Sequence, residues 1–92
     1  MTAYVIAELE ITDPEGFKAY GPLVRASVEK YGGAYAVRGA TVTALDGEAP
    51  KRVAILTFEY GAAAQRWYQS PEYTEARAIR LKSTRSRMFI VE

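Results

Sequence analysis

Apolar and polar residues alternate from residue 3 to residue 11, and this period of two predicts a β-strand with one buried face. The same alternation predicts further strands over 34–38, 52–60 and 87–92. Both faces of the 52–60 stretch are largely apolar. Residues 41–45 are rich in β-branched side chains and predict an additional edge strand or hairpin arm before a turn at Asp46-Gly47.

Between Asp13 and Gly33 the apolar residues instead recur at steps of three and four, the spacing of a helix with one buried face. Asp13-Pro14 supplies a capping carboxylate and a first-turn proline, and Gly32-Gly33 ends the run through a left-handed C-cap. Inside the run, the ring of Pro22 would clash with the carbonyl of Lys18. We therefore expect a kink at Gly21-Pro22.

A second helical stretch comes in two parts. Residues 61–69 are helical by composition, and Ser70-Pro71-Glu72 then starts a new segment that runs to about residue 84. Ser70 is expected to cap this segment rather than to act as a nucleophile, because no histidine or evident lysine base accompanies it. Tyr73, Arg77 and Arg80 fall on one side of the new segment.

The resulting order, βαββαβ, predicts an α+β fold of the ferredoxin-like type, with an antiparallel sheet and both helices on one of its faces. The 92 residues form a single domain, 1–92. The other sheet face would carry Tyr4, Ile6, Val53 and Ile55, or the opposite set if the sides are reversed. Either set is too apolar to meet water as one patch. We therefore predict a homodimer that packs sheet against sheet.

Composition narrows the range of functions. Twelve Lys and Arg stand against eleven Asp and Glu, a balance that argues against nucleic-acid binding. The chain has no cysteine and no histidine, so we expect no metal and no cofactor, a carboxylate-only metal site being the sole remaining option. It shows no apolar run long enough to cross a membrane and no signal-peptide pattern, and we expect a cytoplasmic protein.

Several motifs resemble those of one known family, DUF1330, in the dimeric α+β barrel superfamily. The motifs that carry the resemblance are Tyr20, Tyr31-Gly32-Gly33, Val37-Arg38-Gly39, Asp46-Gly47, Trp67-Tyr68-Gln69-Ser70-Pro71-Glu72-Tyr73 and Arg80. The resemblance covers essentially the whole chain. It implies a ferredoxin-like dimer that forms a barrel, with no established activity. Relatives in the superfamily include cofactor-free monooxygenases, small-molecule isomerases and haem peroxidases.

Arg38 is the first candidate for ligand binding. The alternation places it on a strand face with Ala34 and Ala36, whose small side chains leave room for a ligand. A guanidinium in such a place can hold a carboxylate or enolate oxygen through its planar fork. The alternative is a structural ion pair with Asp46 or Glu48.

Arg80 is open to the same two interpretations: it is a ligand clamp, or it pairs with Glu8 or Glu59. Tyr73 is the aromatic residue most expected to line a pocket, whereas Trp67 is more often a core residue at this spacing. The hydroxyl groups of Tyr4 and Tyr20 could point into the same cavity. Asp46 is either a proton carrier or only a turn residue.

Two functions remain from these residues. The first is a binding protein that holds a small organic acid in a pocket of Tyr, Trp and Arg side chains. The second is a cofactor-free enzyme of the monooxygenase or isomerase type, in which an arginine stabilises an oxyanion and a tyrosine or Asp46 moves a proton. The second ranks lower because, without histidine, its proton carrier would need a strongly shifted pKa.

Overall fold

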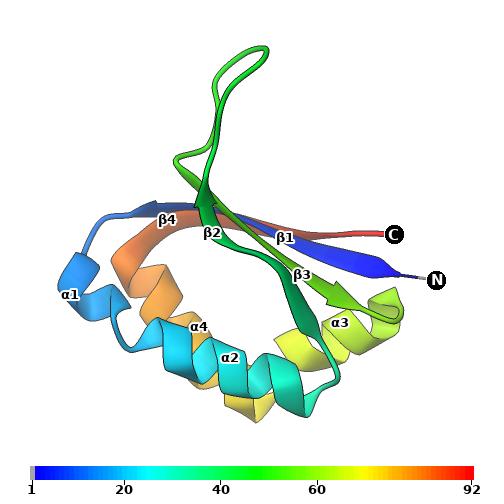
Figure 1. The fold of residues 1–92 in the computed structure, drawn as a ribbon. Coiled ribbons are helices and arrows are strands. Elements are labelled where there is room, and N and C mark those ends of the chain that lie inside the picture. Colours follow the sequence, from blue (N-terminus) through cyan, green and yellow to red (C-terminus); the bar gives the residue numbers. More distant parts are fainter. Residues whose placement is uncertain (1) are drawn as a thin grey trace.

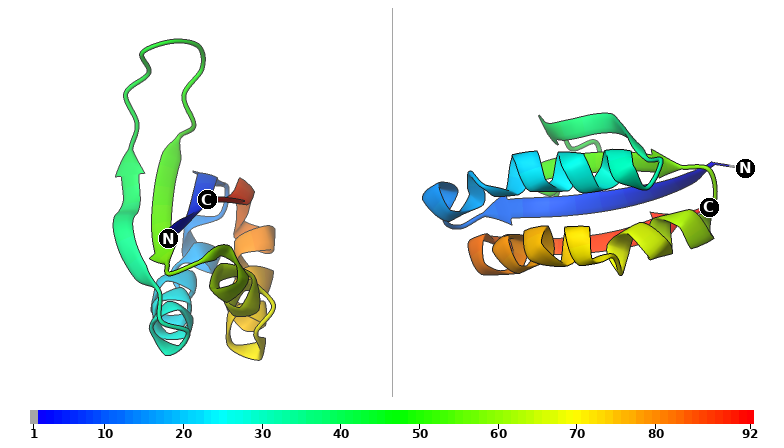
Figure 2. Two further views of the ribbon diagram at one scale, coloured as in Figure 1. Left: turned by 90° about the vertical axis from the view of Figure 1, so that its right-hand side faces the viewer. Right: turned by 90° about the horizontal axis from the view of Figure 1, so that it is seen from below.

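The computed structural model describes residues 2–92 and shows a four-stranded antiparallel sheet in the order β2-β3-β1-β4. The elements follow one another as β1 (Ala3–Ile11), α1 (Pro14–Phe17), α2 (Tyr20–Lys30), β2 (Ala34–Thr41), β3 (Arg52–Phe58), α3 (Gly61–Tyr68), α4 (Pro71–Ser83) and β4 (Thr84–Val91). All four helices lie on one face of the sheet (Figures 1 and 2). The predicted ferredoxin-like α+β fold is confirmed.

The strands depart from the predicted boundaries in two places. β4 begins at Thr84, three residues before the predicted start, because its pairing with β1 extends to Ile11. No separate strand forms over 41–45. Instead β2 continues to Thr41, and the chain from 42 to 51 leaves the sheet as a long loop that rises on the side away from the helices (Figure 1).

The first helix is broken rather than kinked, and the break lies before Gly21-Pro22. α1 ends at Phe17 and α2 begins at Tyr20, so Lys18 and Ala19 separate them. Pro22 would have clashed with the carbonyl of Lys18 in a continuous helix. Because α2 begins at Tyr20, Pro22 lies in the first turn of this helix. The N–H groups of a first turn have no intrahelical acceptor, so the missing N–H of Pro22 costs no hydrogen bond there.

The predicted caps are confirmed. The Asp13 side chain accepts a hydrogen bond from the Gly16 amide at 3.2 Å. The Ser70 hydroxyl accepts one from the Tyr73 amide at 3.1 Å and donates to the Trp67 carbonyl at 2.6 Å, which joins α3 to α4. After α2, Gly32 adopts the left-handed conformation with φ 79°.

The core lies between the helices and the inner sheet face, which carries Val5, Ala7 and Leu9 of β1. At its centre Trp67 is fully buried, and its indole N–H donates to the Ser27 hydroxyl at 2.9 Å. The opposite face of β1 carries Tyr4, which is 42 % exposed. The sequence had grouped these residues into two faces correctly and had left open which face the helices cover.

A polar cluster joins α2 to α4 at the surface. Lys30 forms an ion pair with Glu72, and the Tyr31 hydroxyl donates to the same carboxylate at 2.9 Å. The hydrogen bond from Lys30 is the main reason that the pKa of Glu72 falls from 4.5 to about 2. Glu72 therefore favours the folded state when it is ionised.

We expect the Glu72→Gln variant to be less stable than the wild type near neutral pH, because the ionised Glu72 is lost. A carboxyl group with a lowered pKa stabilises the fold above its unfolded value of 4.5, and this contribution disappears as the pH falls to about 2. The difference between the two proteins should therefore shrink over this interval, as measured by urea unfolding. Glu75→Gln is the matched control: it removes a carboxylate of the same helix that forms no ion pair in residues 2–92, and it should lower the free energy of unfolding less near neutral pH. If the difference in unfolding free energy between wild type and Glu72→Gln stays constant with pH, the lowered pKa of Glu72 is contradicted.

Candidate functional site

Two register shifts in β2 decide where Arg38 lies. Tyr35 is opposite Leu56 and Val37 is opposite Ile55, so β2 advances two residues while β3 advances one. A second shift follows at Gly39, whose φ is 51°. The prediction that Arg38 lies on the same strand face as Ala34 is therefore wrong. Strict alternation fails because each bulge inserts an unpaired residue.

After the first bulge, Arg38 and Tyr35 lie on the helix side of the sheet and line the same pocket. The Arg38 guanidinium lies 5.1 Å from the centroid of the Tyr35 ring, a cation–π distance. Its neighbours are thus an aromatic ring and an open pocket rather than the two alanines expected. The predicted alternative, an ion pair with Asp46 or Glu48, does not form in the described part of the chain.

The pocket has a volume of about 180 Å³ and lies between α2 and the inner face of the sheet. Its three charged side chains are all arginines, Arg25, Arg38 and Arg52, and its phenols are Tyr20 and Tyr35. Apolar side chains form the rest of the lining together with two glycines. Among the residues that the structure describes, no carboxylate lines this pocket. Its electrostatic character is therefore positive at the rim and apolar within.

The two phenols of the pocket are held in their neutral form. Burial raises the pKa of Tyr20, and the neighbouring Tyr73 raises it further. Burial also raises the pKa of Tyr35, against the opposing effect of Arg38. Both hydroxyl groups therefore keep their protons at neutral pH. They are suited to donate a hydrogen bond to a ligand and unsuited to act as a base.

Behind the pocket, Tyr20 connects to two of the other predicted site residues. The hydroxyl oxygens of Tyr20 and Tyr73 lie 2.9 Å apart, and Arg80 donates from Nε to the Tyr73 hydroxyl at 3.1 Å. Arg80 is only 3 % exposed and also donates from Nη1 to the Ser86 hydroxyl at 2.6 Å. It forms no ion pair with Glu8 or Glu59 in the described chain.

The remaining predicted residues lie elsewhere. Trp67 packs against Tyr73 with ring centroids 4.2 Å apart and belongs to the core rather than to a pocket wall. Asp46 lies on the exposed 42–51 loop, and Tyr4 lies on the face of the sheet away from the helices. The structure thus brings together Arg38, Tyr20, Tyr73 and Arg80, and separates Asp46 and Tyr4 from them.

Sequence reasoning missed the three other polar residues of the pocket: Arg25, Tyr35 and Arg52. Gly21 and Arg25 lie four positions apart on α2, and each directly follows a buried residue, Tyr20 or Val24. Residues four positions apart lie on the same side of a helix, so this spacing was a usable signal for Arg25. Tyr35 was hidden by the bulge. Arg52 donates from both Nε and Nη2 to the Gly39 carbonyl at 3.0 and 2.8 Å, a contact that depends on strand register.

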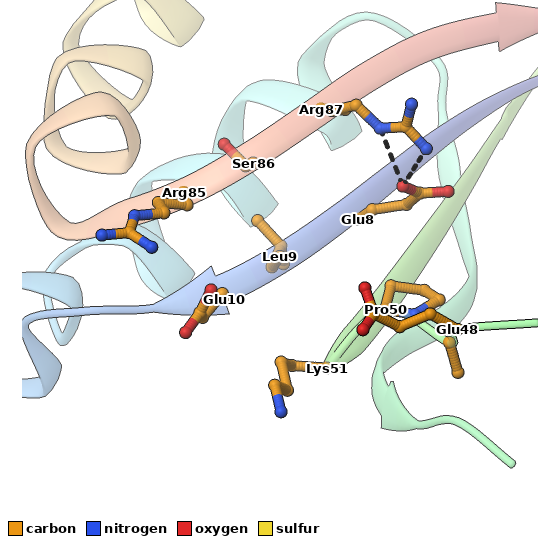
Figure 3. Close-up of a pocket in the computed structure, with 10 residues that line it drawn as sticks. Glu8, Leu9, Glu10, Glu48, Pro50, Lys51, Arg85, Ser86 and Arg87 are labelled. Atoms are coloured by element: carbon orange, nitrogen blue, oxygen red, sulfur yellow. Dashed lines mark hydrogen bonds and ion pairs between the residues drawn. The ribbon is translucent and has the colours of Figure 1, made fainter. Parts of the chain in front are cut away.

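A larger hollow, of about 410 Å³, lies on the opposite face of the sheet, at the base of the 42–51 loop (Figure 3). Its lining carries charges of both signs, and Arg87 pairs with Glu8 at 2.6 Å. Glu10 and Arg85 are cross-strand neighbours in the same hollow. These groups largely balance one another, so this hollow offers a ligand no excess of either charge.

Residues 2–92 lack two further kinds of feature. No group of three or more acidic side chains lies close enough together to hold a metal ion. None of the described helices combines the length and the apolar character that crossing a membrane requires.

Comparison with known proteins supplies the family. No curated protein matches the chain. Several solved structures share its fold at low identity, among them the following three. The RPA0582 protein of unknown function from Rhodopseudomonas palustris is 21 % identical, with a TM-score of 0.78 over 98 % of this chain and 80 % of that one. A dimeric ferredoxin-like protein of unknown function from Jannaschia sp. CCS1 is 12 % identical, with a TM-score of 0.78 over 100 % and 99 %.

The third is SnoaB, a cofactor-independent oxygenase from Streptomyces nogalater, which is 14 % identical, with a TM-score of 0.71 over 99 % of this chain and 91 % of that one. At these identities the likeness concerns the fold alone. The family model for the domain of unknown function DUF1330 matches residues 2–92, which confirms the resemblance seen in the sequence. The chain therefore belongs to the DUF1330 family and has its ferredoxin-like fold.

Proposed function

We propose that this protein binds a small organic anion in the pocket between α2 and the sheet. One observation carries the proposal: every charged side chain on the pocket wall is an arginine, and no described carboxylate accompanies them. Arginines left without an acidic partner are suited to hold a carboxylate through paired hydrogen bonds. Arg38 is the main candidate, because Arg52 already donates twice to the Gly39 carbonyl.

The dimensions of the pocket limit the ligand. Its volume of about 180 Å³ lies below the range of roughly 300–1,000 Å³ that drug-sized ligands occupy. Phe17 and Val24 contribute apolar surface to it, and Tyr20 stacks on Phe17 with centroids 5.1 Å apart. A single aromatic ring or a short chain that bears one carboxylate or enolate fits these properties.

A thermal-shift screen tests the proposal with a panel of small carboxylates and quinone-like phenols, from benzoate to short aliphatic acids. We expect at least one anion to raise the melting temperature of the wild type, since a ligand that binds only the folded state stabilises it. Arg38→Ala should reduce the affinity by about 10- to 100-fold, because a charged hydrogen bond contributes about 1.5–3 kcal/mol.

Arg66→Ala is the matched control, because Arg66 is an exposed arginine on α3 away from the pocket. It should leave the ligand-induced shift unchanged. Equal ligand-induced shifts in wild type and Arg38→Ala would exclude Arg38 as the binding residue. A panel without any effect on the wild type would contradict the proposed function.

A cofactor-free oxygenase or isomerase remains the second candidate. The fold that the chain shares with SnoaB supports it, and the neutral phenol of Tyr20 could donate to a developing oxyanion. The same raised pKa makes Tyr20 and Tyr35 poor bases, and Asp46 lies outside the pocket. Binding therefore ranks above catalysis, as it did in the sequence.

We also propose that the protein acts as a homodimer. The sheet face away from the helices is uncovered, with Tyr4, Phe89 and Val91 exposed at 42, 41 and 43 %. The 42–51 loop rises from this face (Figure 1). It carries Leu45, which is 95 % exposed. Exposed apolar side chains that gather on one face are typical of an interface. A second copy would cover the strands, and the loop would flank it.

A further inference from the structure

Arg80 is a buried cation whose known partners are all neutral. Its Nε donates to Tyr73 and its Nη1 to Ser86, and it forms no ion pair in the described chain. A guanidinium has only donors, so the Tyr73 oxygen must accept this bond. Accepting from a cation draws electron density away from the phenol and makes its own proton a stronger donor.

Tyr73 has two possible acceptors for that proton. The Tyr20 oxygen lies at 2.9 Å, whereas the Met88 sulfur lies at 3.8 Å and is a weak acceptor. The shorter hydrogen bond, to the Tyr20 oxygen, is the stronger one. The bond from Arg80 polarises the Tyr73 hydroxyl and so strengthens its donation to Tyr20. The donors then align as Arg80 to Tyr73 to Tyr20. Tyr20 is the one residue of this hydrogen-bonded series that lines the pocket, and in this order of donors its own proton is not used within the series.

We propose that Arg80 and Tyr73 are positioning residues that hold Tyr20 as a hydrogen-bond donor to the bound anion. This inference rests on the proposed function and deepens it, because it sets the chemistry of the ligand. The ligand presents an acceptor oxygen, a carboxylate or an enolate, to Tyr20 while the rim arginines neutralise its charge. Benzoate meets this requirement, and its neutral isostere benzamide meets it less well.

The orientation of Tyr20 can be tested without any ligand. Tyrosine labelled with ¹³C at Cζ reports the hydrogen bonding of each phenol by NMR. We expect Arg80→Met to shift the Tyr20 resonance in the wild type and to leave it unshifted in the Tyr73→Phe background, because the effect passes through Tyr73. Arg80→Lys keeps the positive charge and should preserve part of the wild-type position. Far-UV circular dichroism verifies that each variant is folded.

Met88→Leu is the matched control for the direction of the Tyr73 proton, since this exchange preserves apolar volume. It should leave the Tyr20 resonance in place. A shift as large as the one caused by Tyr73→Phe would show that Tyr73 donates to the sulfur and would overturn the proposal. An Arg80→Met shift that persists in the Tyr73→Phe background would overturn it as well, because Arg80 would then act on Tyr20 by another route.

The ligand class is tested by benzoate and benzamide titrations of the same proteins. Tyr20→Phe should weaken benzoate binding about tenfold, and Tyr73→Phe about three- to tenfold. In the Tyr20→Phe background, Tyr73→Phe should add no further loss, since its effect requires the Tyr20 hydroxyl. Equal losses in both backgrounds, or equal affinities for benzoate and benzamide, would overturn the positioning role. Failure of the wild type to bind either compound would count against the proposed function, while the ligand-free spectra decide the orientation of Tyr20 separately.

Discussion

The Trp67→Ala variant is expected to lose about 3–5 kcal/mol of unfolding free energy, the largest effect of any single substitution considered for this chain. Trp67 is fully buried, and its ring packs against Phe58 and Tyr73 with centroids 5.6 and 4.2 Å apart. Alanine would leave a cavity where α3, α4 and the sheet meet. It would also leave the Ser27 hydroxyl without the indole donor.

The free energy of unfolding of a small domain is only about 5–15 kcal/mol, so the Trp67→Ala substitution would remove much of the stability of the fold. Urea unfolding should be followed by far-UV circular dichroism, because Trp67 is the only tryptophan and its fluorescence disappears with it. Wild type and variant should be compared at equal protein concentration. Leu81→Ala, at a position that is 58 % exposed on α4, should cost less than about 0.5 kcal/mol. Equal losses for the two variants would contradict the central place of Trp67 in the core.

The Ile55→Glu variant is expected to be a folded monomer, whereas the wild type is expected to be a dimer. Ile55 pairs with Ile6 on the uncovered face of the sheet, where the proposed second copy would bury it. An unpaired carboxylate buried in such an interface costs about 3 kcal/mol or more, which corresponds to at least about 100-fold in the dimer dissociation constant. The monomer itself should tolerate the change, because the carboxylate then meets water.

Sedimentation velocity at micromolar concentration measures this result. The sedimentation data should give the wild type a molecular mass of twice the 10.2 kDa of one chain, and they should give Ile55→Glu a mass of 10.2 kDa. Ala78→Glu adds the same charge to an exposed position of α4 and should leave the dimer intact. A wild type that sediments as a stable folded monomer would remove the basis of the proposed dimer. A variant that remains dimeric would place the interface on another face.

The parts of the fold that were predicted correctly depend on local signals. Asp13 and Ser70 cap helices through bonds to amides three residues later, so their effect can be read within one turn. The alternation over 3–11 grouped the residues of β1 into its two faces correctly, because this strand carries no bulge. An interruption of the first helix near Pro22 was predicted from the clash of the proline ring. The helix is interrupted, although the break falls before the predicted position.

The errors arose where strand pairing decides the outcome. Gly39, at the second shift, is a residue type that favours a bulge, but the shift between Tyr35 and Val37 has no glycine or proline to indicate it. That shift moved Arg38 to the helix side of the sheet. Likewise, the 41–45 segment has the composition of a strand, yet it has no neighbouring strand to pair with beyond Thr41.

The sequence by itself determined the order of helices and strands, the caps at Asp13 and Ser70 and the residues that share each face of β1, because each depends on residues within a few positions of one another. Only the tertiary structure decided the site. Tyr20 and Tyr73 meet from helices 53 positions apart in the chain, and Arg80 takes neutral hydroxyl groups as partners instead of an acid. Such contacts depend on how the helices cross and how the strands register. These arrangements are set by packing over the whole core, which no single stretch of residues specifies.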